Sequence, residues 1–169
     1  MLWHPAYVGL GSNLERPASQ VRRALAALAE VPATRLVRQS SLYGSRPLGP
    51  VAQPDFVNAV AGLLTGLDVR EFFAQLRALE RRLGRVPPRE RWGPRLIDLD
   101  LLVFSQLQLA DEQLRLPHPG IVERNFVLYP LAEVAPELPV PGCGRVAELA
   151  ARINSEGLWR LDSEPATSP

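Results

Sequence analysis

Two aspartates stand two residues apart in the otherwise apolar run "RLIDLDLLVF". Side chains alternate along a strand, so Asp98 and Asp100 point to one side while Leu99 points to the other. Neighbouring carboxylates repel each other, and Mg²⁺ relieves that repulsion while also taking phosphate oxygens and water as ligands. The pair therefore indicates a magnesium site for a phosphorylated substrate. A solvated strand face, or ion pairs with Arg91 and Arg95, are the alternatives.

The segment before these aspartates is rich in arginine and proline. It contains Arg85, Arg89, Arg91 and Arg95. Guanidinium groups bind phosphate in a bidentate fashion, and a metal-binding carboxylate pair next to them suits transfer from a nucleotide. In such reactions metal ions bridge the phosphates while arginines offset the developing charge. The alternative is a solvated basic loop.

A second group of residues could hold a flat heterocycle. In "PDFVNAV", Phe56 and Asn58 fall on one strand face, where an aromatic plane and an amide stack on and hydrogen-bond to such a ring. Phe126 is a candidate for an opposing plane, although core packing explains both phenylalanines as well. His118, between two prolines, either donates to a phosphate or caps a turn. The "GSN" at 11–13 offers backbone donors for a polar contact, or an ordinary helix N-cap.

Composition narrows the class of protein. A chain of 169 residues suggests one domain, and 46% hydrophobic residues suffice for a core. All 19 basic residues are arginine, which excludes a P-loop and lysine Schiff-base chemistry. The net charge of +1 gives no indication of a nucleic-acid or membrane partner. Cys143 is the single cysteine, which excludes an intrachain disulfide and fits a reducing, cytoplasmic location. No secretory signal or membrane-spanning run is evident.

Hydrophobic periodicity predicts the elements that position these residues. Strands are expected over 6–11, 34–43, 56–66 and 95–104, with amphipathic helices before 34 and over 68–84. Asp68 has the position of an N-cap. The order β-α-β-β-α-β predicts an α+β fold with a ferredoxin-like antiparallel sheet. C-terminal additions, with a loop and then a helix after 116 and a short helix after 144, extend it to a three-layer αβα arrangement.

Four sequence blocks together resemble one known family. They are "YVGLGSNL", "SSLYGSRPLGPVAQPDFVNAV", "GRVPPRERWGPRLIDLDLLVF" and "LPHPGIVERNFVLYPLAEVAPEL", covering roughly residues 6–140. In this order they resemble the 6-hydroxymethyl-7,8-dihydropterin pyrophosphokinases of folate biosynthesis. The resemblance implies transfer of pyrophosphate from ATP to the pterin hydroxymethyl group, with attack at the β-phosphorus, release of AMP, and two Mg²⁺ ions on the triphosphate.

The resemblance also implies roles for individual residues. Asp98 and Asp100 match the metal ligands, and Arg85 and Arg95 match the catalytic arginines. The positions matching pterin contacts are Ser45, Leu48, Phe56, Asn58, Trp92 and Phe126. The positions matching the nucleotide side are Glu80, Arg91, His118 and Arg124. Pro87 and Pro88 depart from the pattern, because some relatives carry basic residues in the loop that closes over ATP. Two prolines are expected to narrow the motion of that loop.

We expect one pyrophosphokinase domain over 1–160 and a disordered tail over 161–169. The chain is expected to act as a monomer on ATP and the pterin, without nucleic acid or membrane partners. Two other classes of protein were weighed. A small-ligand or metal-binding regulatory module is compatible with a ferredoxin-like fold, but the paired aspartates with arginines argue against it. An RNA-binding domain has a related sheet topology, but its glycine-aromatic signature is missing.

Overall fold

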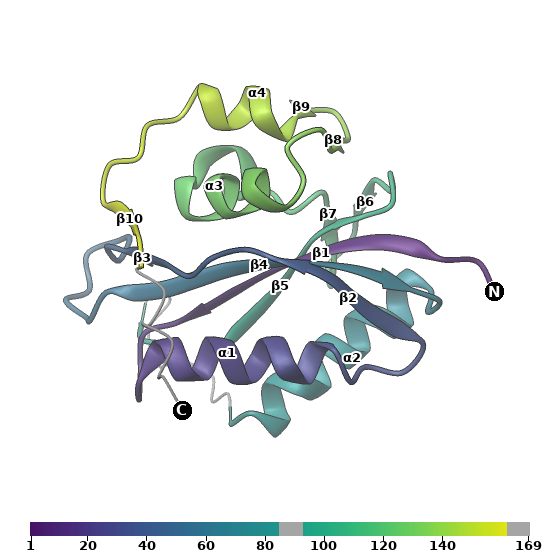
Figure 1. Ribbon diagram of the computed structural model, residues 1–169, viewed down its shortest axis with the longest axis horizontal. Helices are drawn as coiled ribbons and strands as arrows, with labels where there is room; N and C mark the ends of the chain where they lie inside the picture. The colour runs from purple at the N-terminus through teal and green to yellow at the C-terminus, as the bar shows by residue number, and fades with distance from the viewer. Residues whose placement is uncertain (85–92, 162–169) are drawn as a thin grey trace, which may run out of the picture.

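An antiparallel sheet separates two layers of helices (Figure 1). The structure is a computed structural model that describes residues 1–84 and 93–161. Helices α1 (Pro17–Leu28) and α2 (Val69–Arg82) cover one face of the sheet. Helices α3 (Asn125–Val134) and α4 (Val146–Ala151) cover the other. The predicted mixture of helices with an antiparallel sheet is confirmed.

The sheet brings together strands that are far apart in sequence. Its elements are β1 (His4–Ser12), β2 (Thr34–Gln39), β3 (Tyr43–Ser45), β4 (Phe56–Thr65), β5 (Asp98–Phe104) and β10 (Leu158–Arg160). They lie in the order β10-β3-β4-β1-β5, and β2 also pairs with β4. Strand β1 is therefore flanked by β4 and β5, with Gly11 opposite both Asn58 and Asp98. This register places the predicted amide and the first predicted metal ligand at the same end of the sheet.

Shorter elements complete the chain. Two hairpins are formed by β6 (Leu109–Ala110) with β7 (Arg115–Leu116), and by β8 (Pro139–Val140) with β9 (Gly144–Arg145). A single 3-10 turn, η1 (Ile121–Glu123), precedes α3. Within the described ranges, no helix is both long and apolar enough to cross a membrane.

The expected single strand over 34–43 is wrong, because the structure has β2 and β3 with a break between them. At the break, Ser40 is buried and exchanges hydrogen bonds with Val60, from Ser40 N to Val60 O and from Val60 N to Ser40 Oγ, both 2.9 Å. The next residue, Ser41, faces the α3–α4 layer, where its N and its Oγ both donate to the Glu133 carboxylate of α3. Alternation alone could not reveal a contact made 92 residues away.

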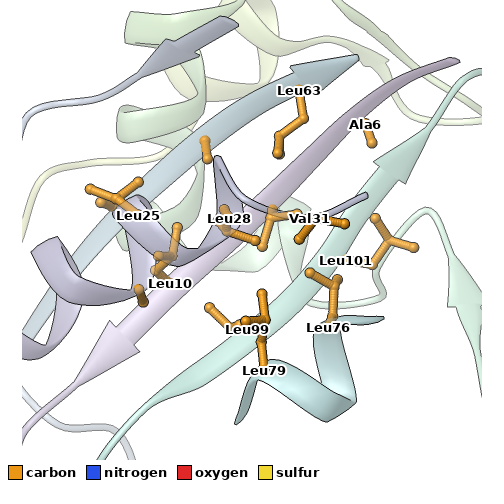
Figure 2. Close-up of a cluster of buried hydrophobic side chains, with 14 of the residues drawn as sticks. Ala6, Leu10, Leu25, Leu28, Val31, Leu63, Leu76, Leu79, Leu99 and Leu101 are labelled. Atoms are coloured by element: carbon orange, nitrogen blue, oxygen red, sulfur yellow. The ribbon is translucent and has the colours of Figure 1, made fainter. Parts of the chain in front are cut away.

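Each face of the sheet has its own hydrophobic core. The first lies under α1 and α2, where Leu25, Leu28, Leu76 and Leu79 meet Leu99 (Figure 2). The second lies between the sheet and the α3–α4 layer. The predicted apolar stripes of the first two helices point into the first core, and Asp68 caps α2 as expected, its Oδ1 accepting from Glu71 N at 2.9 Å. Leu99 and its aspartate neighbours thus face opposite sides of β5, as alternation predicts.

Candidate active site

A pocket of about 310 Å³ lies where β1, β3, β4 and β5 approach the start of α3. Such a volume accommodates a small molecule. The residues singled out in the sequence that line it are Ser45, Leu48, Phe56, Asn58, Arg95, Asp98, Asp100, His118, Arg124 and Phe126. They are supplied by three strands, one helix and the segments that connect these elements. The fold therefore brings most of the predicted site into one cavity.

The two aspartates lie side by side on β5, in register with two glycines of β1, Gly11 and Gly9. Arg95 is close to the first of them, with its Nε 3.7 Å from Asp98 Oδ2. Burial raises the pKa of the Asp100 carboxyl, and the charge of Asp98 adds to that increase, while His118 opposes it. Both effects penalise a second negative charge here, and a bound divalent cation would relieve both.

Within residues 1–84 and 93–161, no group of three or more His, Cys, Asp and Glu side chains is arranged to hold a metal. Two carboxylates are nonetheless a sufficient protein contribution for Mg²⁺, which takes its remaining ligands from substrate phosphates and water. The donor set therefore fits Mg²⁺ delivered with a nucleotide better than a permanently bound structural metal. The ion pair with Arg95 predicted as an alternative is present for Asp98, but at 3.7 Å it is longer than a hydrogen bond.

His118 is held by its backbone and by one ring nitrogen. Its backbone N donates to Leu102 O of β5 at 2.9 Å, and its Nδ1 accepts from Gly120 N at 3.0 Å. Because Nδ1 is the acceptor, the neutral ring carries its proton on Nε2. Burial lowers the pKa of His118, although the charge of Asp100 acts in the opposite direction. With Nδ1 accepting from Gly120 N, Nε2 is the ring nitrogen that can donate to a ligand. The imidazole also fulfils the alternative, turn-capping role.

The amide of Asn58 is fixed in place inside the pocket. Its Nδ2 donates to Ser45 Oγ at 2.7 Å, and both side chains are buried. The amide oxygen faces Gly11, where a Cβ would lie 3.3 Å from it, so a larger residue at 11 would crowd the amide. Phe56, two residues earlier on β4, shares the pocket. An aromatic side chain and an oriented amide therefore line the same pocket.

The opposite wall comes from the beginning of α3. Phe126 lines the pocket, and the guanidinium of Arg124 lies 5.9 Å from the centre of its ring. That guanidinium packs against Gly120, where an added Cβ would come within 2.7 Å of it. Gly120 therefore leaves space for Arg124 beside the aromatic ring.

The side chain of Asn13 does not cap a helix but hydrogen-bonds to two other segments of the chain. Helix α1 begins after Arg16, which makes no side-chain capping bond, so the N-cap alternative for the "GSN" block is wrong. Asn13 is 2% exposed; its Nδ2 donates to Gln53 Oε1 and to Pro54 O, both at 2.9 Å. Its Oδ1 accepts from Arg95 N at 2.8 Å. The sequence showed that Asn13 directly follows β1, but it did not show which residues its side chain contacts.

Glu80 does not line the pocket. It is buried between α2 and β5, where its Oε2 accepts from Leu99 N at 2.8 Å. Its predicted role toward the nucleotide stays a prediction. Arg85, Arg91 and Trp92, together with the Pro87–Pro88 pair, lie outside the described residues, as does the predicted tail beyond Leu161.

A second hollow adjoins the first along the outer side of β5. It is lined by residues that include Phe73, Arg77 and Arg115. Asp100 and His118 line both cavities. The second aspartate and the histidine thus lie at the junction of the two cavities.

Comparisons with known proteins agree with this arrangement. Crystal structures of Plasmodium falciparum HPPK-DHPS superpose with a TM-score of 0.74 for the wild type with pterin and p-hydroxybenzoate, and 0.72 for the A437G variant with pteroate. Identity is 15% in both cases, so these similarities concern the fold. They cover 95% and 94% of this chain, but the chain spans only 45% and 46% of those longer proteins.

Sequence relatives are considerably closer. The 2-amino-4-hydroxy-6-hydroxymethyldihydropteridine pyrophosphokinase of Pseudomonas aeruginosa is 48% identical over 155 residues, covering 92% of this chain and 95% of the relative. The enzyme of the same name from Haemophilus influenzae is 40% identical, covering 93% and 98%. The model of the 7,8-dihydro-6-hydroxymethylpterin-pyrophosphokinase family matches residues 7–136. The chain therefore belongs to this family of pyrophosphokinases, as the sequence blocks predicted.

Proposed function

We propose that this chain transfers pyrophosphate from ATP to 6-hydroxymethyl-7,8-dihydropterin in folate biosynthesis. The hydroxymethyl oxygen bonds to the β-phosphorus, and the bond from that phosphorus to the oxygen shared with the α-phosphate breaks. AMP leaves, and the hydroxyl proton is released. Family membership supports the reaction, and the observation that carries the assignment of the site is that Asp100 and His118 line two adjoining cavities. A two-substrate transfer needs such a junction.

The pterin occupies the first pocket. Phe56 and Phe126 provide apolar planes for the bicyclic ring, and Asn58 reads its polar edge. The Ser45 hydroxyl fixes which way the Asn58 amide faces. Leu48, on the loop before β4, covers the same space, and Trp92 is proposed to contact the pterin as well.

ATP occupies the second hollow, with its phosphates extending toward the aspartates. Asp98 and Asp100 would hold Mg²⁺, and we infer two ions. When bound, Mg²⁺ neutralises charge on the phosphates and on the developing transition state. Arg95 and the predicted Arg85 offset charge on the transferred group. His118, through its Nε2 proton, and Arg124 donate to phosphate oxygens, and Arg91 is proposed to contribute to ATP binding as well.

The titratable groups that line the pocket, Asp98, Asp100 and His118, are assigned to Mg²⁺ and phosphate, and phosphoryl-type transfer makes modest demands on a general base. Positioning and charge compensation are therefore the main contributions of the protein.

The order of β5, β1, β4 and then β2 with β3 supports a ferredoxin-like frame, in which each helical connection joins strands separated by one other strand. The α3–α4 layer is an addition to that frame. We propose one pyrophosphokinase domain over 1–160 that acts as a monomer in the cytoplasm.

The test is to incubate the purified chain with ATP, Mg²⁺ and the hydroxymethylpterin and to separate the nucleotides by chromatography. The expected products are AMP and the pterin diphosphate in equal amounts, formed only when all three components are present. Formation of ADP, or AMP formation that is independent of the pterin, would refute the proposal. A pterin without the hydroxymethyl group is the matched control, because it fills the pocket but offers no attacking oxygen.

A further inference from the structure

Two charged side chains of α2 hold a single residue of β5. Glu80 is 2% exposed, and its Oε2 accepts from Leu99 N at 2.8 Å. Its Oε1 is 2.8 Å from Arg77 Nη1, and Arg77 Nη2 donates to Leu99 O. Both polar backbone groups of Leu99 are thus bound by side chains that are themselves bound to each other. We call Arg77 and Glu80 the α2 clamp.

The clamp acts at the residue between the two aspartates. Strand β5 ends the sheet order beside β1, so no strand formed by residues 1–84 and 93–161 lies on its other side. In an antiparallel pair, alternate residues direct both N–H and C=O away from the partner strand. Leu99 is such a residue, because its N–H and C=O bond to α2. Asp98 and Asp100, one residue to each side, consequently direct their backbone groups toward β1.

The chemistry of the clamp points to more than packing. Glu80 is buried while Arg77 is partly exposed, and replacing an ion pair withdrawn from water by apolar residues of similar volume is often neutral for stability, because desolvation offsets the attraction. The surrounding α2 positions, Leu76 and Leu79, show that apolar side chains fit this interface. Arg77 is further held with its guanidinium 4.9 Å from the centre of the Phe73 ring. Its fork geometry lets one group bond the carboxylate and the carbonyl together.

We propose that Arg77 and Glu80 are positioning residues, which fix the Leu99 backbone and so set the separation and direction of the Asp98 and Asp100 carboxylates for divalent metal binding. The metal's identity rests on the function proposed above. The clamp never touches the metal, and its effect is transmitted through one residue of β5. Partners that orient metal ligands from outside the coordination sphere typically change metal affinity by about 10- to 100-fold.

The main test measures Mn²⁺ binding by electron paramagnetic resonance in the presence of a non-hydrolysable ATP analogue. Glu80→Ala is expected to weaken Mn²⁺ binding by about 10-fold or more. Glu80→Gln keeps an oxygen for Leu99 N and is expected to retain most of the affinity. Leu76→Ala, in the same helix and equally buried, is the stability control and should bind Mn²⁺ as the parent does. Equal weakening by Glu80→Ala and Leu76→Ala would overturn the proposal.

A second measurement needs neither metal nor turnover. Amide hydrogen exchange at Leu99 should be slow in the parent and faster in Glu80→Ala, with little change in Leu76→Ala relative to its global stability. If Glu80→Ala does not fold, Arg77→Met replaces it, because Arg77 is partly exposed and the change removes the donor to Leu99 O. Parental Mn²⁺ affinity in Arg77→Met together with unchanged Leu99 exchange would overturn the clamp.

The two proposals fail differently. A parent chain that binds Mn²⁺ with the analogue but forms no AMP would refute the pyrophosphokinase assignment and leave the clamp intact. A parent chain that forms AMP, with Glu80→Ala binding Mn²⁺ normally, would refute the clamp alone.

Discussion

Asn13 and Arg95 exchange a reciprocal pair of hydrogen bonds. Asn13 N donates to Arg95 O at 2.9 Å, and Arg95 N donates to Asn13 Oδ1 at 2.8 Å. The remaining amide hydrogens of Asn13 reach Gln53 and Pro54 on the loop that carries Leu48. One buried side chain therefore connects the end of β1, the proposed pterin loop and the backbone of the proposed charge-stabilising arginine.

We expect Asn13→Ala to lower kcat by about 10- to 100-fold, because displacing a charge-stabilising group by even 1 Å has effects of that size. Asn13→Asp retains an oxygen for Arg95 N but loses the donors to Gln53 and Pro54. Its kcat should fall less, while its KM for the pterin should rise. Steady-state kinetics with both substrates varied separate the two effects. Identical defects in both variants would show that the hydrogen bond from Arg95 N to Asn13 Oδ1 makes no separate contribution to kcat.

Arg95→Ala should lower turnover by about 100-fold or more, the usual effect of losing one transition-state contact. Pterin binding, measured by calorimetry, should change little, because the guanidinium is assigned to the transferred group. Arg152→Ala removes an exposed arginine at the end of α4 and serves as the control for lost charge. Normal turnover in Arg95→Ala would contradict the assignment.

Asn58→Ala should weaken pterin binding by about 10-fold or more, the cost of a buried polar group left without its partner. ATP binding should be unchanged, since Asn58 lines only the first of the two cavities. Ser45→Ala should have a smaller effect in the same direction, because it frees the amide to rotate without removing it. Titration calorimetry with each ligand provides the comparison. An equal loss of ATP affinity in Asn58→Ala would contradict the assignment of Asn58 to pterin binding.

The link between β3 and α3 predicts a pH dependence of stability. Burial, followed by a 2.8 Å hydrogen bond to Glu133, raises the pKa of Tyr43 from 10.0 to about 12. The folded phenol keeps its proton where the unfolded one loses it, so this stabilisation is complete below pH 10 and is lost as the pH rises through about 12. Glu133→Gln should lower the pKa of Tyr43 toward 10.0.

Ultraviolet absorbance of tyrosinate follows this titration, and Tyr43→Phe identifies which transition belongs to Tyr43. The loss of stability at alkaline pH should shrink in both variants when it is measured by urea unfolding. An unchanged late transition in Glu133→Gln would mean that burial alone raises this pKa.

The sequence revealed features that depend on local pattern. The alternation around Leu99 predicted that both aspartates share a side of β5, and the pocket contains both. The blocks resembling a known family brought together residues such as Phe56 and Phe126, which no periodicity connects. Strand β10 was not predicted, because "LWR" is too short to show alternation and pairs with β3 over a separation of more than a hundred residues.

What remained hidden was the set of contacts made by polar side chains. Asn13 was read as a local donor because a sequence shows its neighbours but not Pro54 or Arg95. The resemblance placed Glu80 on the nucleotide side, which stays a prediction, but it gave no sign of the bonds from Glu80 to Leu99 and Arg77. Some of these partners are distant in sequence, and others are reached only in one side-chain rotamer. The spacing of residues in the sequence reveals neither.

The α2 clamp also bears on the exposed backbone edge of β5. An outermost strand with unoccupied backbone groups is a template on which another polypeptide can add. Strand β5 combines that position with the apolar run "LLVF". Glu80 and Arg77 bind the N–H and C=O of Leu99. These two backbone groups therefore cannot pair with a strand of another polypeptide. The two side chains that are proposed to orient the metal site therefore also leave one position of this sheet edge unavailable for intermolecular β-pairing.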